Sequence, residues 1–374
     1  MRRPAPLRSA AVFAQWESQA RHNLAASAAE TMSLPDLLAL ANEPERDAWD
    51  SLQLGYLETR GTPALREAIA STYLQIEPDQ VLGFTSGKEA IFVALHALVE
   101  PDGEVLTFTP NYQPLEEVPR LRGRVRAVAL REDENWRLDL DDVRRAIGPR
   151  TQLICLNCPH NPTGMVLDRE MFDGLIRLAA VHGTYILSDE VYRGLERNPD
   201  RRLPQMADVY PRGLSLNVMS KTYGLPGLRV GWIASQDRDA LDAIGGVKDY
   251  LSDGNAGPSE ILTRIALRNA DTLLSRNREI ASHNLDRLNA FFDARADLFQ
   301  WAPPSAGCVA YPRYKGTEGV EAFCARVIEQ AGVLLLPASV YASALGPTPT
   351  DRFRIGFGKR SLPSGLDALS VVLP

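Results

Sequence analysis

Lys221 is the residue with the clearest potential for covalent chemistry. Lysine and arginine together number 41 in this chain of 374 residues, and only five are lysines: Lys88, Lys221, Lys248, Lys315 and Lys359. Only lysine offers a primary amine that can lose its proton and form a Schiff base. Lys221 follows an apolar run, 214–220, and precedes a Gly- and Pro-rich turn. Its amine is therefore predicted to lie at the carboxyl end of a strand.

Asp189 and Asn161 also follow apolar runs and could hold a cofactor. Asp189 ends the run 184–189, and a carboxylate there can keep a pyridine nitrogen protonated, as an electron-sink cofactor requires. The same placement also suits a helix N-cap. Asn161 stands in Pro-His-Asn-Pro-Thr-Gly, 159–164. Its amide could donate to a phenolate oxygen, although the segment alone predicts only a turn.

A third segment could bind a phosphate group. Thr85-Ser86-Gly87-Lys88 joins an apolar run to an amphipathic one through a glycine. The first backbone N–H groups of a helix have no partner within the helix, so they can bind an anion. One glycine is weak support by itself, because many strand-to-helix turns contain one.

These segments need a scaffold that brings several strand ends together, and the middle of the chain predicts one. Between residues 60 and 235, short apolar runs alternate with amphipathic segments, which is typical of β-α units in a mostly parallel sheet. The predicted strands are 81–86, 104–109, 125–130, 151–157, 184–189, 214–220 and 230–234, and the predicted crossover helices are 64–73, 89–98, 140–147 and 169–182. In such sheets, ligands bind at the carboxyl ends of the strands.

The last third of the chain predicts a different arrangement. Helical patterns cover 237–250, 258–270 and 271–297; strands follow near 308–312, 333–336 and 352–356, with helices near 319–331 and 363–372. No repeat or low-complexity linker separates the two parts. We predict a large domain over 40–250 and a smaller α/β domain built from both chain ends, 1–39 and 251–374.

Composition excludes several classes of protein. Hydrophobic residues make up 45% and charged residues 24%, so the chain is not disordered. The net charge of −6, without a basic block, does not indicate a nucleic-acid or membrane partner. No apolar run is long enough to span a membrane, and residues 1–30 lack the apolar core of a signal peptide. We therefore expect a cytoplasmic protein that acts on small molecules.

The four cysteines are expected to be structural. Cys155-x-x-Cys158 has no second pair at a spacing typical of zinc ligands, and Cys308 and Cys324 stand alone. Four cysteines are also too few for a disulfide scaffold in a chain of this length. We expect no metal site and no redox role for them.

Together, the Ser-Lys-Thr-Tyr-Gly-Leu-Pro-Gly-Leu-Arg run, 220–229, and the Pro-His-Asn-Pro-Thr-Gly run resemble the class I/II aminotransferases, which are fold-type I pyridoxal-phosphate (PLP) enzymes. The resemblance covers nearly the whole chain. It implies a three-layer αβα large domain around a mostly parallel sheet, plus a smaller α/β domain. It also implies PLP as the cofactor.

The resemblance gives each motif residue a role. Lys221 would form the internal aldimine and shuttle the proton, and Asp189 would pair with the pyridine nitrogen. Asn161 and Tyr192 would bind the ring oxygen, while Tyr112 would stack on the ring. The other cofactor-binding residues, mostly around the phosphate, would be Ser86, Gly87, Lys88, Ser220 and Arg229.

Two further residues would contact the substrate and a second subunit. Arg354, in Arg-Phe-Arg-Ile-Gly, 352–356, matches the position that binds the substrate α-carboxylate, with Asn161 beside it; a planar guanidinium suits that task. Tyr56 matches a tyrosine that reaches the phosphate of the neighbouring subunit. The resemblance thus implies a homodimer with active sites at the interface.

The chain departs from the family pattern at two positions. Val218 stands where many relatives have a phosphate-binding serine, three residues before the lysine, and Lys88 stands where a small residue is more usual. We hypothesise that the Lys88 ammonium replaces the missing hydroxyl as a phosphate contact.

The reaction itself stays open between related chemistries. The resemblance implies ping-pong transamination between an L-amino acid and a 2-oxo acid through the Lys221 aldimine. Trp16-Glu17 and Val-Met-Ser-Lys, 218–221, resemble the capreomycidine-synthase-like branch, which cyclises hydroxylated arginines, so elimination with ring closure is the alternative. A second alternative is a PLP-binding protein without catalysis, which the complete motif set disfavours. A dinucleotide-dependent oxidoreductase is set aside, because no Gly-x-Gly-x-x-Gly follows the first strand.

Overall fold

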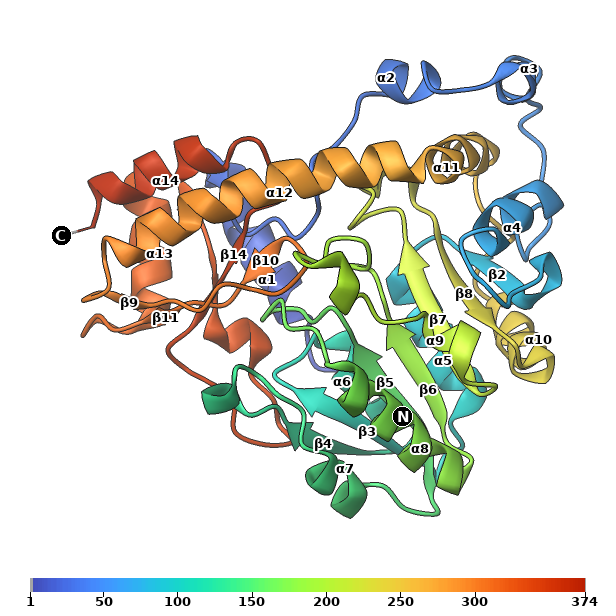
Figure 1. Ribbon diagram of the computed structural model, residues 1–374, viewed down its shortest axis with the longest axis horizontal. Helices are drawn as coiled ribbons and strands as arrows, with labels where there is room; N and C mark the ends of the chain where they lie inside the picture. The colour runs from blue at the N-terminus through green and yellow to red at the C-terminus, as the bar shows by residue number, and fades with distance from the viewer. Residues whose placement is uncertain (1–2, 374) are drawn as a thin grey trace.

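A seven-stranded sheet forms the centre of the larger body (Figure 1). The computed structural model describes residues 3–373. The strand order is β2-β8-β7-β6-β5-β3-β4, and β8 alone runs antiparallel to its neighbours. The strands are β2 (Val81–Phe84), β3 (Glu104–Thr109), β4 (Arg124–Ala129), β5 (Thr151–Asn157), β6 (Tyr185–Asp189), β7 (Gly213–Val218) and β8 (Gly231–Ser235). The expected α/β fold with a mostly parallel sheet is confirmed.

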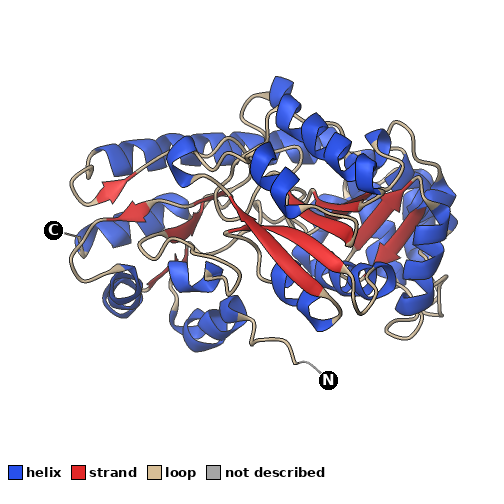
Figure 2. Ribbon diagram, turned by 90° about the horizontal axis from the view of Figure 1, so that it is seen from below, coloured by secondary structure: helices blue, strands red, loops and turns tan. Residues whose placement is uncertain are grey.

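Helices cover both faces of this sheet, as Figure 2 shows from below. Successive side chains of a strand point to opposite faces. Leu153 and Cys155 of β5 accordingly join the core formed with α5 (Gly87–Leu98) and α10 (Arg238–Lys248). Ile154 and Leu156 join the core formed with α7 (Leu140–Ala146) and α8 (Arg169–His182). Burial on both faces explains why the strands read as continuous apolar runs.

Local signals set most helix boundaries where the sequence predicts them. The Asp168 side chain caps α8 by accepting from the Met171 N–H, and Gly183 ends it with a φ of 63°. Helix α4 (Pro63–Ala70) ends three residues earlier than expected. There the Ser71 hydroxyl donates to the Ala68 carbonyl, so side-chain hydrogen bonds replace the next helical turn.

The second body combines the two ends of the chain. Strand β1 (His22–Asn23) pairs in parallel with β12 (Val333–Leu334), and β14 (Phe353–Gly356) lies between β10 (Val309–Ala310) and β13 (Leu336–Pro337). The remaining elements here are β9 (Phe299–Gln300), β11 (Arg313–Tyr314), α12 (Ala270–Asp293), α13 (Val320–Ala331) and α14 (Leu362–Val371). The assignment of 40–250 and of 1–39 with 251–374 to two domains stays a prediction, and residues 1, 2 and 374 lie outside the described residues.

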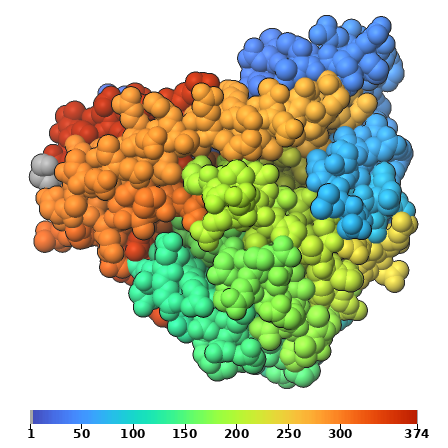
Figure 3. All heavy atoms as spheres, in the orientation of Figure 1, coloured from blue at the N-terminus to red at the C-terminus, as the bar shows by residue number. Residues whose placement is uncertain are grey.

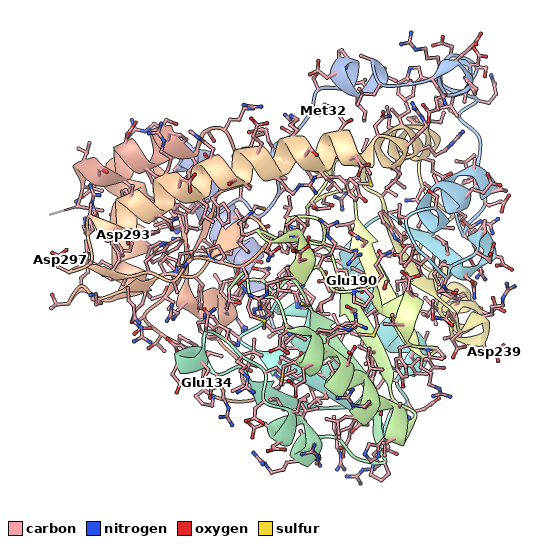
Figure 4. All side chains as sticks on the ribbon, viewed as in Figure 1. Met32, Glu134, Glu190, Asp239, Asp293 and Asp297 are labelled. Carbon is pink, nitrogen blue, oxygen red and sulfur yellow. The ribbon has the colours of Figure 1, made fainter. Side chains whose placement is uncertain are left out.

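Part of the N-terminal region crosses to the other side of the molecule. Met32, labelled in Figure 4, lies on the segment that passes α12 and leads to α2 (Leu34–Leu38) and α3 (Glu43–Asp50). These two short helices contact α11 (Gly257–Arg268) and project from the outline of the molecule in Figure 3. The other short helices are α1 (Arg8–Trp16), α6 (Pro114–Glu117) and α9 (Met206–Val209). None of the helices over residues 3–373 has the length and apolar character that a membrane crossing needs.

Candidate active site

The carboxyl ends of β5, β6 and β7 border a cavity of about 670 Å³. Its walls come from the sheet, from α1 near the start of the chain, and from β14 near the end. The structure brings every expected site residue except Tyr56 to this cavity: Ser86, Gly87, Lys88, Tyr112, Asn161, Asp189, Tyr192, Ser220, Lys221, Arg229 and Arg354.

Tyr56 lies away from the cavity. Its side chain is 91% exposed. Its expected role requires a second subunit, so that role stays a prediction.

Asp189 is held at the end of β6 with its carboxylate available to the cavity. The residue is 4% exposed, and its Oδ1 accepts a hydrogen bond from the Val191 N–H at 3.3 Å. Burial raises the pKa of Asp189 to about 7, and the positive charge of Lys221 works against that rise. The neighbouring Glu190, labelled in Figure 4, bonds instead to the Met206 N–H and the Ser215 hydroxyl. Of these two adjacent carboxylates, only Asp189 lines the cavity.

Asn157 links the strand ends to the Asn161 loop, and the sequence reasoning missed it. Its amide donates to the Asp189 carbonyl at 3.0 Å, and its Oδ1 accepts from the Asn161 N–H at 2.7 Å. Both bonds are buried, so they fix Asn161 relative to Asp189. The available signal was the position of Asn157 at the last residue of a predicted strand, directly before the proline-rich loop.

Lys221 carries a buried amine in an unusual electrostatic setting. Its Nζ donates to the Ser27 hydroxyl at 2.6 Å. Burial, with smaller contributions from the charges of Arg354 and Lys88, lowers the pKa of Lys221 to about 8, and the charge of Asp189 opposes this shift. A lysine with this pKa is partly neutral near neutral pH, as a base or nucleophile must be.

Two other lysines have structural hydrogen bonds instead. Lys248 Nζ donates to the Thr59 carbonyl at 2.6 Å, and Lys359 Nζ donates to the Ala29 carbonyl at 2.8 Å. A carbonyl only accepts, so these partners favour the charged amine. The hydroxyl partner sets Lys221 apart from them.

Arg354 forms a buried polar cluster with Asn161 and Tyr341. Its Nη1 donates to the Tyr341 hydroxyl at 2.7 Å and to the Asn161 Oδ1 at 3.2 Å, and its Nη2 donates to the Ala25 carbonyl at 2.6 Å. Its Nε is buried and has no partner among the described residues. A carboxylate in the cavity would satisfy that donor. Tyr341 was missed, because nothing in the sequence around it signals a polar role.

The start of α5 has the geometry that could hold an anion. Ser86 caps the helix: its hydroxyl accepts from the Glu89 N–H at 3.2 Å, and the first helical bond runs from the Ala90 N–H to its carbonyl. The N–H groups of Gly87 and Lys88 therefore precede the hydrogen-bonded part of the helix. A Cβ on Gly87 would lie 3.1 Å from the Val218 Cγ1, so glycine is the residue that fits.

The two tyrosines expected at the ring lie on the cavity wall. The Tyr192 hydroxyl donates to the Ser27 carbonyl at 2.9 Å. Burial raises the pKa of both Tyr192 and Tyr112 well above the usual value, so both stay protonated. Arg229 adopts a left-handed conformation, with φ of 52°, and its side chain reaches the cavity near Pro226.

Helix α1 forms the wall opposite the sheet. Phe13 and Glu17 line the cavity from this segment, and Arg8 ties the helix down, because its backbone N–H donates to Gln113 and its Nε donates to the Val340 carbonyl. Glu17 is exposed, and within residues 3–373 its carboxylate has no ion-pair partner.

The four cysteines are free and buried. Burial raises the pKa of Cys308, which lies closest to the site, to about 11, so it is a neutral thiol. Its Sγ lies 3.6 Å from the Ser27 carbonyl.

The residues around the cavity fit PLP. Asp189 offers a carboxylate to a protonated ring nitrogen, the α5 N-terminus offers free N–H groups to a phosphate, and Lys221 offers an amine to an aldehyde.

Comparisons with known proteins agree with this reading. The family described as aminotransferase class I and II matches residues 23–362. Capreomycidine synthase of Streptomyces vinaceus is 31% identical over 83% of this chain and 78% of its own. Arginine–pyruvate transaminase of Pseudomonas aeruginosa is 29% identical over 83% of this chain and 80% of its own. The crystal structure of the PLP-dependent cyclase OrfR superposes with a TM-score of 0.90 at 27% identity, covering 100% of this chain and 98% of that one. The chain therefore belongs to the class I and II aminotransferase family of fold-type I PLP enzymes.

Proposed function

We propose that the chain is a PLP-dependent aminotransferase that moves the amino group of an L-amino acid to a 2-oxo acid in two half-reactions. One observation carries the proposal: Lys221, Asp189 and Arg354 all face one cavity of about 670 Å³. When bound, PLP supplies an aldehyde that reacts with amines and a ring that withdraws electrons from the substrate α-carbon. The protein must then hold the cofactor, orient the substrate and move a proton.

Several residues would hold the cofactor. Asp189 would pair with the protonated ring nitrogen, and that positive charge would draw its pKa back down from about 7. Asn161 would donate to the ring oxygen, and Tyr192 would do so once its hydroxyl turned from the Ser27 carbonyl. Tyr112 would stack on the ring. The phosphate would be held by Ser86, Gly87, Lys88, Ser220 and Arg229.

Lys221 and Arg354 would act on the substrate. The unpartnered Arg354 Nε would bind the α-carboxylate beside Asn161 and so direct the α-hydrogen towards Lys221. The Lys221 amine, with a pKa of about 8, would take that proton from the α-carbon and then deliver it to the cofactor carbon. One buried amine would then both accept and deliver the proton.

Glu17 supports an amino donor with a cationic side chain. Its carboxylate lines the cavity without an ion-pair partner among the described residues. A guanidinium would provide two parallel donors to such a carboxylate. The similarity to an arginine–pyruvate transaminase supports the same class, and we propose an arginine-type substrate.

Cyclisation of a hydroxylated arginine is the second candidate. It is supported by the 31% identity to capreomycidine synthase, by the likeness to a PLP-dependent cyclase, and by a Glu17 that would hold a guanidinium inside the cavity. A leaving group on the substrate would divert the reaction after the proton has moved to Lys221. Both candidates therefore use the same protein groups, and the substrate decides between them.

Absorbance and product analysis would separate the two. With L-arginine, an aminotransferase loses its absorbance near ~420 nm and gains absorbance near ~330 nm, and added pyruvate restores the first band while forming alanine. A cyclase instead gives a cyclic product from hydroxyarginine without any oxo acid. If the PLP-loaded protein gives no spectral change with any amino acid, the proposed function is wrong.

We also propose that the protein works as a homodimer. Tyr56 and Leu54 are 91% and 87% exposed, and Tyr250 is 92% exposed. Large hydrophobic side chains exposed in this way are typical of a surface that a partner covers. In a dimer, Tyr56 would reach the phosphate of the neighbouring subunit. Mixing Tyr56→Phe and Lys221→Ala chains tests this, because a hybrid dimer would contain one site with both residues intact only if sites are shared.

A further inference from the structure

The segment 25–29 contacts three of the groups assigned to the chemistry. The Ser27 hydroxyl lies 2.6 Å from the Lys221 Nζ, and the Ser27 carbonyl accepts from the Tyr192 hydroxyl at 2.9 Å. The Ala25 carbonyl accepts from Arg354 at 2.6 Å. The sequence of this segment, Ala-Ala-Ser-Ala-Ala, offers a single polar side chain, and that side chain meets the lysine.

The backbone around Ser27 is anchored independently of its hydroxyl. The Ala29 N–H donates to the Lys221 carbonyl at 3.0 Å, and the Ala29 carbonyl accepts from Lys359 at 2.8 Å. With the Tyr192 bond, these contacts fix the position of the Ser27 Cα. The Ser27 hydroxyl is thus presented to Lys221 from a rigid support.

A hydroxyl differs from other partners because it both donates and accepts. It accepts from an ammonium group and donates to the lone pair of a neutral amine, so it can hold Lys221 in one place in both protonation states. A carbonyl would favour the ammonium group alone, as at Lys248 and Lys359. A carboxylate would raise the pKa of the lysine.

We propose that Ser27 is a positioning residue that holds the freed Lys221 amine in line with the substrate while the amine gains and loses its proton. The proposal rests on the proposed function of Lys221. In that step the proton would leave the α-carbon and bind Nζ, the electron pair would pass into the ring of the bound cofactor, and Nζ would then deliver the proton to the cofactor carbon. Within residues 3–373, Lys221 is the only hydrogen-bond partner of the Ser27 hydroxyl, so the hydroxyl acts through the lysine.

Other charged groups also face Lys221 and act on its protonation. Arg354 and Lys88 disfavour the ammonium and Asp189 favours it, while Cys308 faces Lys221 as a neutral thiol. None of these four is bonded to Nζ, whereas Ser27 is. Their effect would be common to wild type and to Ser27 variants, so a comparison of those proteins isolates the hydroxyl.

The first test needs no substrate. In the cofactor-free full-length chain, the pH dependence of Lys221 reductive methylation is followed by peptide mass spectrometry. The hydrogen bond to the charged form is the stronger of the two, so Ser27→Ala should move the half-labelling pH down by about half a unit or more, and Ser27→Thr should restore it. Ser235→Ala is the matched control: the hydroxyl of this buried serine in β8 donates to the Gly213 carbonyl in β7, and its loss should leave Lys221 labelling unchanged.

The second test uses the PLP-loaded enzyme. Ser27→Ala should lower kcat by about tenfold to 100-fold with KM nearly unchanged, raise the α-deuterium isotope effect, and recover in Ser27→Thr. Labelling and kcat that match wild type in Ser27→Ala would overturn the proposal. A labelling shift in a protein that turns over no amino acid would leave the Ser27–Lys221 contact standing and refute the proposed function instead.

Discussion

The two ends of the cavity are built in different ways. The cofactor end, defined by Ser86, Asp189 and Lys221, is formed at the ends of strands in one sheet, and its backbone is buried between two helical layers. The proposed substrate end, defined by Glu17 and Arg354, is formed by β14 and by α1 with the turn that follows it, which come from opposite ends of the chain.

This difference gives a physical reason why one end of the cavity can change more easily than the other. Moving a strand end would disturb a close-packed core, so the cofactor end is costly to alter. Helix α1 has no fully buried residue and is tied down by a few hydrogen bonds, so the wall that it forms can change more easily. Family members can therefore share a cofactor and act on different substrates.

Removing Lys221 should have the largest effect, because Lys221 would both bind the cofactor and move the substrate proton. Lys221→Ala should lower turnover by about 10³-fold or more. Borohydride treatment and digestion of the wild type should add the mass of the cofactor to the Lys221 peptide, and the variant should stay unmodified. The exposed Lys315→Ala is the control and should keep full activity. Wild-type protein whose Lys221 peptide gains no mass would contradict the assignment.

Asp189→Asn should weaken turnover and yet stabilise the cofactor-free protein. Without the carboxylate the ring nitrogen loses its anionic partner, so turnover should fall roughly 10²-fold. The folded pKa of about 7 lies above the usual value of 3.8. The folded protein therefore binds more protons between these values, and the wild type loses stability as pH rises from about 4 to 7.

Urea unfolding at pH 5 and pH 8 measures this effect. The variant lacks the ionisation, so the difference in unfolding free energy in favour of Asp189→Asn should grow with pH and reach up to about 4 kcal/mol at pH 8. Bound PLP should reverse this order, so that the wild type becomes the more stable of the two proteins. If the difference in unfolding free energy is the same at pH 5 and pH 8, burial does not raise the pKa of Asp189.

A change at the substrate end should leave the cofactor end intact. Arg354→Lys keeps the charge and loses the planar fork, so KM for the amino acid should rise about 30-fold while PLP affinity is unchanged. Titration of the cofactor-free protein with PLP, next to initial-rate kinetics, checks both values. Loss of PLP affinity in this variant would show that the two ends are coupled.

Glu17→Gln should act on one class of substrate. We expect KM for arginine to rise about fivefold, because an ion pair at a partly exposed site is modest, and KM for an uncharged amino acid to stay constant. Glu43→Gln, on the first turn of α3 away from the cavity, is the control. An equal change for both substrates would contradict a role in recognising a cation.

The smallest effect should come from the two unusual residues at the phosphate site. Lys88 is exposed and lines the cavity, so Lys88→Ala should weaken PLP binding about threefold to tenfold. Val218→Ser should recover part of that loss in the double variant, since its hydroxyl would lie beside the Gly87 backbone. A Lys88→Ala protein that binds PLP as tightly as wild type would contradict the hypothesis that Lys88 replaces the hydroxyl missing at Val218.

The cofactor end was more predictable than the substrate end for a physical reason. Asp189 and Lys221 follow apolar runs, and parallel strands bring their carboxyl ends to one edge, so local patterns were enough to group them. Ser27 and Tyr341 carry no such pattern, because an alanine-rich segment and a single short 3-10 turn give no periodic signal. Their roles arise from contacts with residues far along the chain.

The sequence by itself determined the order and approximate positions of the central strands and helices and which motif residues stand near strand ends, because periodicity, caps and turns act over a few residues. Only the tertiary structure decided that Ser27 meets Lys221 across 194 positions and that Arg354 joins Tyr341 and Asn161. It also decided the lowered pKa of Lys221 and the raised pKa of Asp189, since burial and neighbouring charges exist only once the chain ends close over the sheet.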